Sequence, residues 1–422
     1  MKAAPPSRWH HSLLRLYLHY FTLALPSLLL VGSLTACSTQ TISTTAFTQL
    51  TAETGKLNED ELLDVGVTVF EPGLDDIPSK REELTFADVR MAETQYAAYQ
   101  LVQTLQSSGA WGTVRVIPND QSNTDVAVHG TILQSDGQTM LVKVSVKDAS
   151  GQQWYEKEYK EVVGKYSYDP RQRRTEDAFL GLYNRIANDM LAYRKKNLDR
   201  NGLLSIRTIS RLLFARSFAP QAFDQYLTTS GRGQIKLNRL PAADDPMLKR
   251  IDTIRERDYL YVDALQEYYG NFARQMQGPY NDFRSRSYAE IIKYDKLKSE
   301  ATRNMVLGVA AIVGGLYALG RNDANVNNVG LGALLGGGYL IKDSFNKKDE
   351  AQMQAQSLAE LGNSMGAEIA PHTIDLDEHV VTLKGNVQEQ YKQWREILAD
   401  IYSTEIGDLS ASVAKPAPKP GL

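Results

Sequence analysis

The stretch TMLVKVSVKD, residues 139–148, has the pattern that decides the fold of this chain. Its valines alternate with lysine and serine, and successive side chains of a β-strand point to opposite faces of a sheet. The pattern predicts a strand with Val142, Val144 and Val146 against a core and with its lysines in water.

Strands are also predicted on both sides of this stretch. DVAVHGTIL (125–133) precedes it and QQWYEKEYKE (152–161) follows it. Asp136-Gly137 and Ser150-Gly151 lie in the two connections, and dipeptides of this kind are typical of hairpin turns. The three segments are therefore expected to form an antiparallel meander.

Two further strands and a helix are predicted upstream. DVGVTVF (64–70) and WGTVRVIP (111–118) are short and rich in valine. Between them, up to about Ser107, apolar residues recur at helical spacing; they are Met91, Ala98, Leu101, Val102 and Leu105. Residues 59–165 are thus expected to form an α/β domain of order β-α-β-β-β. We expect this domain to fold alone, because the helix and the strands bury one apolar face between them.

This order of elements resembles the periplasmic α/β domain of the curli-export lipoprotein and the amino-terminal domain of TolB. The resemblance covers residues 62–162 and rests on the Val-rich strand, the helix, SGAWGTVRVIP, DVAVHGTIL and a hairpin that ends in KDASGQQW. It implies a location in the cell envelope and a tendency to assemble with other copies or partners. The long transmembrane β-hairpins of that group have no counterpart in this sequence, so the resemblance does not imply a pore.

The first 36 residues have the features of a secretory signal peptide. Lys2, Arg8 and Arg15 form a basic flank without acids, and an apolar run follows up to Leu34. The stretch LTAC, which ends at Cys37, resembles the lipobox of bacterial lipoproteins. In that family the cysteine becomes the first residue of the mature chain and carries the lipid, so lipidation with fatty acids such as palmitate is implied here.

Cys37 is the single cysteine of the chain, so a redox role would have no partner cysteine. The alternative to lipidation is an uncleaved anchor helix that contains this cysteine by chance. Ser38 follows, whereas in the family an Asp at that place favours the inner membrane. The resemblance therefore implies the outer membrane, facing the periplasm, and leaves exposure at the cell surface open. Residues 37–58 are rich in Thr and Ser and predict a flexible, lipidated tether.

The charge of the chain bears on its partners. The formal net charge is −3, and removal of a signal peptide with three basic residues and no acid makes it −6. This mild acidity argues against nucleic acid as a partner, because phosphate binding needs a basic face.

Residues 170–300 are predicted to be helical. Apolar residues recur at helical spacing in three segments. The third starts with Asp244 or Asp245 as a cap and Pro246 in its first turn, and it is expected to be interrupted at Gly278-Pro279. This region is rich in tyrosine. Its tyrosines either pack in the core or line a groove that holds a polymer or a peptide.

Two runs rich in Gly and Ala flank the polar loop RNDANVNN: residues 305–320 and residues 329–341. Four-residue spacing of small side chains lets helix backbones approach closely in an apolar medium. The pattern resembles the glycine-zipper hairpins of envelope lipoproteins, and its expected packing residues are Ala311, Gly315, Gly332 and Gly336. Neither run reaches the roughly 20 residues of an ordinary membrane helix. A hairpin in a thin bilayer and a hairpin buried in the soluble fold are the two interpretations.

A small α-β-β-α module is predicted at the carboxyl end. It has two short strands around residues 377–378 and a last helix with Tyr391, Trp394, Leu398 and Ile401 facing inward. The module is weakly similar to BON-type domains of periplasmic proteins. The tail AKPAPKPGL is expected to be extended and disordered.

The whole chain is thus predicted to be α+β. Its expected parts are a signal peptide (1–36), a lipidated tether (37–58), an α/β domain (59–165), a helical domain (170–300), a glycine-zipper hairpin (301–345), an α-β-β-α module (346–408) and a disordered tail (409–422).

The sequence contains no motif of catalysis. It has no phosphate-binding loop, no nucleophile elbow and no His-Glu-x-x-His pattern. His129 is expected to be a solvated strand residue, and the spacing of His372 and His379 matches no familiar metal site. We therefore predict no catalytic residue, no metal and no cofactor.

These observations favour a non-enzymatic outer-membrane lipoprotein. It would assemble as a homo-oligomer or with an envelope protein, in export or in envelope integrity. Its expected membrane contacts are the lipid on Cys37 and, as a second candidate, the hairpin at 305–341. The alternative is a periplasmic binding lipoprotein that recognises peptidoglycan, polysaccharide or an outer-membrane client through its Tyr-rich helices.

Overall fold

The computed structural model describes most of the chain after residue 42. The described residues are 43–55, 57–75, 87–118, 124–169, 176–242, 244–318, 372–376, 379–383 and 386–413. Contacts divide the chain into two compact units, Met1–Ser43 and Thr44–Leu422, and all the elements below belong to the second. The predicted signal peptide, Cys37, Gly332 and Gly336 lie outside the described residues. The predicted start of the disordered tail, at residue 409, is wrong, because the last helix continues to Val413; residues 414–422 lie outside the described residues.

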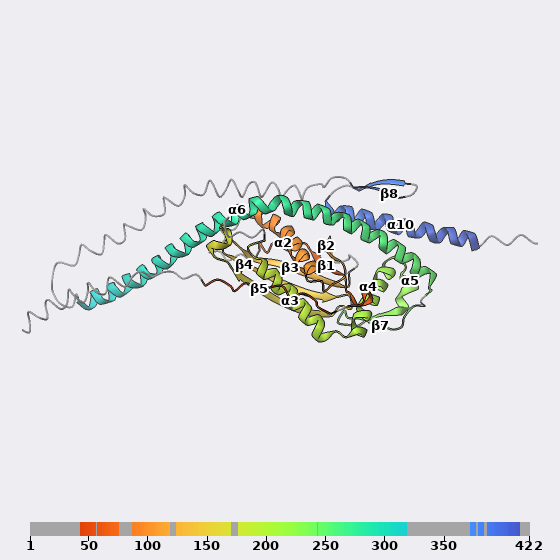
Figure 1. The fold of residues 1–422 in the computed structure, drawn as a ribbon, viewed down its shortest axis with the longest axis horizontal. Coiled ribbons are helices and arrows are strands. Elements are labelled where there is room, and N and C mark those ends of the chain that lie inside the picture. The colour runs from red at the N-terminus through yellow and green to blue at the C-terminus, as the bar shows by residue number, and fades with distance from the viewer. Residues whose placement is uncertain are drawn as a thin grey trace, which may run out of the picture. The chain divides into compact units, whose positions relative to one another are not determined.

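A five-stranded sheet lies at the centre of the second unit (Figure 1). Its strands are β1 (Val65–Thr68), β2 (Val114–Ile117), β3 (Val126–Ser135), β4 (Thr139–Asp148) and β5 (Gln153–Val162), in the spatial order β2-β1-β3-β4-β5. Strand β1 runs parallel to β2 and β3, whereas β3, β4 and β5 form an antiparallel meander. The predicted α+β class is confirmed.

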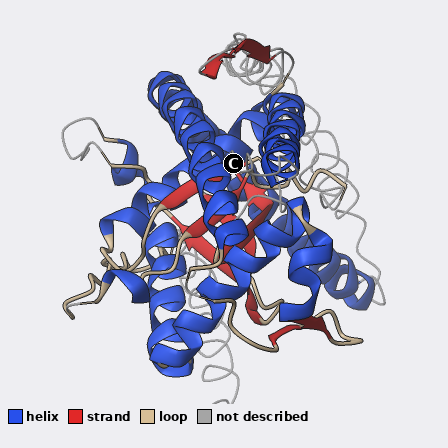
Figure 2. Cartoon of the chain, turned by 90° about the vertical axis from the view of Figure 1, so that its right-hand side faces the viewer, coloured by secondary structure: helices blue, strands red, loops and turns tan. Residues whose placement is uncertain are grey.

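The buried positions of β4 follow its alternating valines. Val142, Val144 and Val146 are fully buried, and Lys147 on the other face is exposed. On that face Lys143 forms an ion pair with Glu156 of β5 at 2.7 Å. The antiparallel part of the sheet therefore packs one face against helices and keeps a polar face, as antiparallel sheets commonly do, whereas β2 is buried at every residue. Figure 2 shows the strands with helices around them.

Helix α2 (Ala87–Ser107) covers the buried face of the sheet. Leu101 and Leu105 are fully buried, as predicted, but Met91 is 50 % exposed. The buried position in that part of α2 belongs to Tyr96, whose ring meets the Tyr280 ring edge to face at 5.2 Å. A later helix thus sets which side of α2 faces inward, and spacing within α2 could not show this.

Three long helices follow the sheet: α3 (Leu180–Asn197), α4 (Arg200–Phe218) and α6 (Pro246–Ala318). Asp245 caps α6, because its Oδ1 accepts the backbone N–H groups of Met247 and Leu248 at 2.9 and 3.2 Å. Pro246 follows as the first helical residue, where its missing N–H costs nothing. The predicted start of this helix is confirmed.

The predicted interruption of this helix at Gly278-Pro279 is wrong, because α6 continues through it. A proline inside a helix removes one hydrogen bond, here to the carbonyl of Gln275. Gln275, Gly278 and Pro279 are exposed, so water can bind that carbonyl. Buried residues on either side, such as Met276 and Tyr280, anchor both halves of the helix. The boundary expected between residues 300 and 301 also falls within α6.

A short hairpin interrupts the region that was predicted to be purely helical. It consists of β6 (Leu227–Thr229) and β7 (Ile235–Leu237), and it follows the short helix α5 (Pro220–Phe223). Gly233 lies in its turn with φ +77°, a conformation that favours glycine. Strands of three residues are too short for alternation to distinguish them from loops, which explains why the hairpin was not predicted.

The carboxyl-terminal region contains β8 (His372–Leu376), β9 (His379–Leu383) and α10 (Val387–Val413), and the two strands pair antiparallel. Helix α10 packs on α6, where Trp394 stacks on Tyr261 at 5.5 Å. Tyr391, Trp394 and Leu398 are buried as predicted, whereas Ile401 is half-buried. The first helix of the predicted module lies outside the described residues.

The predicted glycine-zipper hairpin is described only in its first half. Ala311 and Gly315 lie in the last turns of α6, and their expected partners Gly332 and Gly336 lie outside the described residues. Within the part of the chain that is described, no helix combines the length and the apolar character that a membrane crossing requires.

Candidate functional site

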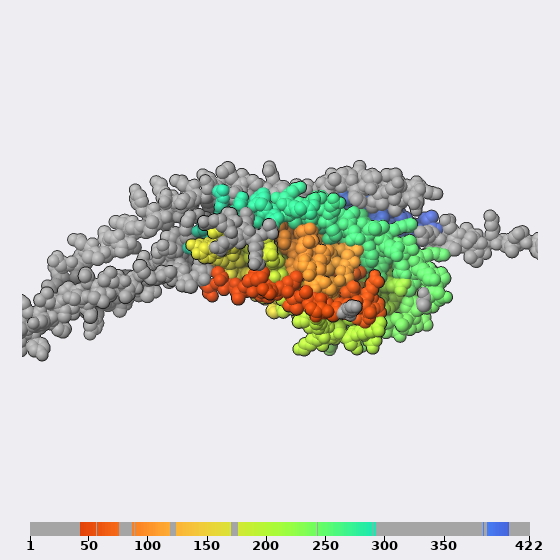
Figure 3. All heavy atoms as spheres, viewed as in Figure 1, coloured from red at the N-terminus to blue at the C-terminus, as the bar shows by residue number. Residues whose placement is uncertain are grey.

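An extended segment, residues 44–55, lies on the surface of the second unit; we call it the strap. In Figure 3 it belongs to the red band beside the orange atoms, which include α2. At its start Thr45 pairs with Val162 at the edge of β5: its N–H donates to the Val162 carbonyl and its hydroxyl accepts the Val162 N–H, both at 2.9 Å. Further along, two asparagines of α3 bind the strap backbone.

These asparagines are Asn184 and Asn188. The Asn184 amide donates to the carbonyl of Thr48 at 2.8 Å. The Asn188 amide donates to the carbonyl of Gln49 at 2.9 Å and accepts the N–H of Thr51 at 2.7 Å. The strap thus has its backbone groups satisfied by side chains, much as a strand would in a sheet.

The strap ends in a buried ion pair. Glu53 bonds Arg194 of α3 at 2.5 Å and Lys195 at 2.9 Å, and the side chains of Glu53 and Arg194 are 5 % and 4 % exposed. Burial raises the pKa of Glu53, but the Gly55 N–H and the neighbouring cations outweigh it and leave this pKa below its usual value. The expectation of a flexible tether over residues 37–58 is therefore wrong from Thr44 to Gly55, because composition carries no information about such nonlocal partners.

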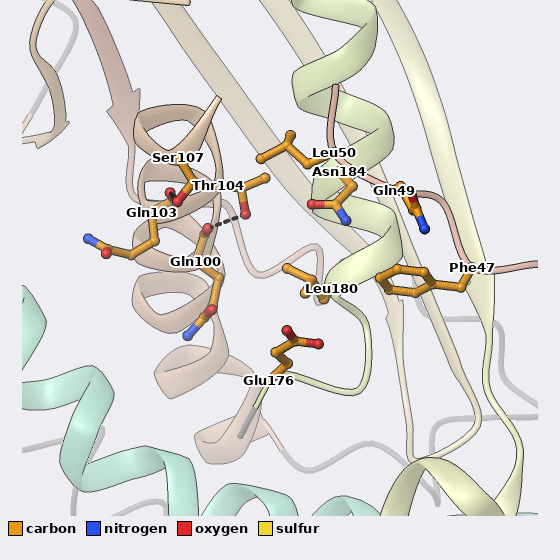
Figure 4. A pocket seen from close by; sticks show the side chains of 10 residues that line it. All are labelled: Phe47, Gln49, Leu50, Gln100, Gln103, Thr104, Ser107, Glu176, Leu180 and Asn184. Atoms are coloured by element: carbon orange, nitrogen blue, oxygen red, sulfur yellow. Dashed lines mark hydrogen bonds between the residues drawn. The ribbon is translucent and has the colours of Figure 1, made fainter. Parts of the chain in front are cut away.

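A groove of about 380 Å³ lies between the strap, α2 and α3; we call it the strap groove (Figure 4). Its lining contains ten residues from the described part of the chain: Phe47, Gln49, Leu50, Gln100, Gln103, Thr104, Ser107, Glu176, Leu180 and Asn184. Leu50 and Leu180 lie between the two helices, and Phe47 stands on the strap side (Figure 4). The groove can therefore offer an apolar base with amide, hydroxyl and carboxylate groups around it.

A buried ionic network lies where α6 meets α2 and the start of α3. Arg284 bonds Asp177 at 2.7 Å, and both side chains are 1 % exposed. Tyr96 donates to the same carboxylate at 2.9 Å, and the guanidinium of Arg284 lies 3.7 Å from the centre of the Tyr280 ring. Removing one partner of such a pair leaves an uncompensated buried charge. We infer that this network fixes α6 in place and has a structural role.

Two more buried carboxylates are Asp125, directly before β3, and Asp258, a residue of α6. Asp125 Oδ2 accepts the N–H of Asp64 at 2.9 Å, and Asp258 Oδ2 accepts the Tyr391 hydroxyl at 3.4 Å. Burial raises the pKa of each to about 6, and neighbouring arginines such as Arg255 counteract this only in part. The second oxygen of each carboxylate has no hydrogen-bond partner among the described residues.

The histidines singled out in the sequence do not converge. His129 is half-buried in β3 and its Nδ1 lies 3.3 Å from the Thr68 hydroxyl. His372 and His379 lie in the pair β8 and β9, opposite Leu383 and Leu376. Among the described residues, no group of three or more His, Cys, Asp or Glu side chains is arranged to hold a metal ion.

None of the α6 tyrosines whose side chains are described is exposed. Tyr261, Tyr269 and Tyr280 are 3 % exposed or less, and Tyr268 is half-buried. Of the two interpretations of this tyrosine pattern, core packing is the one that fits. A binding surface of tyrosines would need the rings to be accessible.

Sequence reasoning did not find the strap groove. Phe47, Gln49 and Leu50 lie in a stretch whose composition favours a linker, and the other walls come from helices far along the chain. Asn184 and Asn188, one helical turn apart on α3, are the available signal, because amides at this spacing can bind an extended backbone. Comparison with known proteins yields no matching family model, curated protein or solved structure, so the chain's own residues are the basis for any function.

Proposed function

We propose that this chain is a lipid-anchored lipoprotein of the outer membrane, a non-enzymatic component of the cell envelope that assembles with other copies or with an envelope partner. The observation that carries the proposal is the stretch LTAC at the end of a basic and apolar amino-terminal segment. The resemblance of residues 62–162 to envelope domains supports the same compartment.

The strap supports a short connection to the lipid. Thr44 follows Cys37 by seven residues, and seven residues of extended chain span at most about 25 Å. Thr45 is already bound to β5. A lipid on Cys37 would therefore keep the folded unit close to the membrane surface.

Lipid labelling tests the anchor. The Cys37→Ser variant is expected to persist as a full-length precursor that incorporates no labelled palmitate, because the modified sulfur is gone. The neighbouring variant Ser38→Ala is the matched control and should be labelled and cleaved like the wild type. Cleavage after Ala36 and outer-membrane partition of the Cys37→Ser variant would exclude the lipoprotein assignment.

Native mass measurement in detergent tests assembly. The wild type is expected to have the mass of several copies or of a complex. Gly336→Leu should weaken it, because a large side chain holds helix backbones apart, whereas Leu334→Ala should have little effect. A wild type that has the mass of one copy and no partner would refute the assembly. Loss of folding in Gly336→Leu would instead place this hairpin inside the soluble fold.

A further inference from the structure

The strap groove has an unusual balance of side chains for a surface hollow. Of the ten described residues that line it, seven are polar, and Glu176 is the one charged residue among these ten. Its remaining surface comes from one aromatic ring and two leucines, with Leu50 and Leu180 half-buried between the helices.

Some of these polar groups are already used by the fold and others are not. The hydroxyls of Thr104 and Ser107 donate to carbonyls of their own helix at 2.9 and 2.7 Å, and Asn184 holds the strap. By contrast, the side-chain amides of Gln49 and Gln100 form no hydrogen bond with the described part of the chain. Each amide offers two donor hydrogens and an acceptor oxygen.

The aromatic ring is accessible as well. Phe47 is 55 % exposed and stands at the side of the groove (Figure 4). Its backbone is held from both sides, because Thr45 is bound to β5 and Thr48 to α3. Phe47 and Gln49 are thus presented by a fixed strap, and less ordering is needed when a ligand binds.

From this lining we propose that the strap groove binds a neutral oligosaccharide. Sugar hydroxyls both donate and accept hydrogen bonds, which matches the glutamine amides. The C–H faces of sugar rings are apolar and pack against aromatic rings and leucines, as at Phe47, Leu50 and Leu180. A volume of about 380 Å³ is within the range of small-molecule sites and takes a short stretch of such a chain.

Other ligand classes match the lining less well. A phosphate or another anion would meet the carboxylate of Glu176 and find no Lys, Arg or His among the described residues that line the groove. An apolar ligand would cover the amides of Gln49 and Gln100 without binding them, and burying polar groups without hydrogen-bond partners is unfavourable.

The cellular location of the bound saccharide depends on the proposed lipid anchor. The chemistry by which the groove binds it does not. The strap that forms one wall begins seven residues after Cys37. A glycan bound in the groove would therefore lie within a short distance of the membrane that holds the lipid.

The test is a binding titration with the full-length protein in a polyoxyethylene detergent, because detergents with sugar headgroups would compete for the groove. Chitotetraose and maltotetraose are the probes, and ligand-observed saturation-transfer NMR is the measurement. We expect at least one probe to bind at millimolar concentration or below. Phe47→Ala and Gln100→Ala should each weaken that binding at least fivefold.

Tyr166→Ala is the matched control, because Tyr166 is also an exposed aromatic residue (60 %) and does not line the groove. It should bind like the wild type, and thermal melting should show all three variants folded. Absence of binding by both probes would overturn the proposal, as would binding that survives in both groove variants. The Cys37→Ser protein should bind equally well, so a failed anchor and a failed groove give different results.

Discussion

Gly137 shows at the scale of one residue how tightly the sheet is joined to α6. An added Cβ at this position would lie 2.0 Å from the carbonyl oxygen of Arg284 and 2.2 Å from the backbone nitrogen of Tyr288. Both neighbours belong to a helix backbone and cannot rotate away. The dipeptide Asp136-Gly137 was recognised as a turn, and the turn is confirmed, but the contact with α6 is a second reason for glycine there.

We therefore expect Gly137→Ala to destabilise the fold by at least about 2 kcal/mol, because either the turn or the helix must shift. Urea unfolding measures the change. Gly231→Ala is the control, since no atom lies within 4 Å of a Cβ added there, and it should change stability by less than about 0.5 kcal/mol. Equal stability of the two variants would show that the β3–β4 turn does not touch α6.

Asp258 makes the stability of the fold decrease as pH rises. Its folded pKa of about 6 is above the usual 3.8, so the folded protein binds this proton more tightly than the unfolded chain. Ionisation therefore destabilises the fold as pH rises through about 6, and the penalty disappears below about pH 4. The charged groups around Asp258 are Arg395 of α10, Arg255 of α6 and Arg115 of β2.

Asp258→Asn is thus expected to be more stable than the wild type at pH 7.5, by up to about 3 kcal/mol. The difference should shrink as pH falls and vanish near pH 4, because the wild-type carboxyl is then neutral. Thermal melting at several pH values measures this. A variant that is less stable than the wild type by the same amount at pH 7.5 and pH 5 would mean that Asp258 contributes through a bond, not through its buried charge.

The attachment of the strap to α3 can also be tested by substitution. Asn188 holds it with two hydrogen bonds, so Asn188→Ala should free the strap while the sheet stays folded. We expect amide hydrogen exchange at Thr51 to become at least tenfold faster, with little change in β3 or β4. Asn197 lies on the same helix, and its side-chain amide donates to the carbonyl of Tyr193 in that helix, not to the strap. Asn197→Ala should therefore leave the exchange at Thr51 unchanged. Slow exchange at Thr51 in the first variant would refute this role of Asn188.

Elements differ in how far the sequence predicts them, and the reason is physical. The strands β3, β4 and β5 were predicted because alternation and turn dipeptides are local signals. Continuity of α6 through Pro279 depends on buried contacts made by both halves of the helix, and the fixed strap depends on asparagines more than 130 residues away. The spacing of Asn184 and Asn188 indicates that α3 can bind an extended backbone, but no local pattern shows which segment it binds, so the groove that these elements build could not be predicted.

The described helices α2, α3, α4, α6 and α10 and the five-stranded sheet contribute to one apolar cluster, which changes the expectation for fragments. Phe179 and Tyr183 of the α3 region and Tyr280 of α6 are fully buried in the same cluster as α2 and the sheet. Residues 59–165 alone would leave that surface uncovered and Glu93 without the hydroxyl of Tyr280, which it binds at 2.7 Å.

We therefore expect the fragment 59–165 to lack a cooperative thermal transition, whereas the fragment 44–292, which keeps the strap, α3, α4 and the packed part of α6, should melt cooperatively. Circular dichroism and dispersed amide signals in NMR distinguish the two. A cooperative transition of the shorter fragment at the temperature of the longer one would show that the sheet and α2 form an independent domain.

At the scale of the whole molecule, we propose that a lipid on Cys37 holds this unit at a membrane. Mass spectrometry of the amino-terminal peptide, from protein purified out of the membrane fraction, tests it most directly. We expect a mature chain that begins at Cys37 and carries the added mass of a diacylglyceryl group. A mature chain that retains residues before Cys37, or one that begins at an unmodified Cys37, would contradict it.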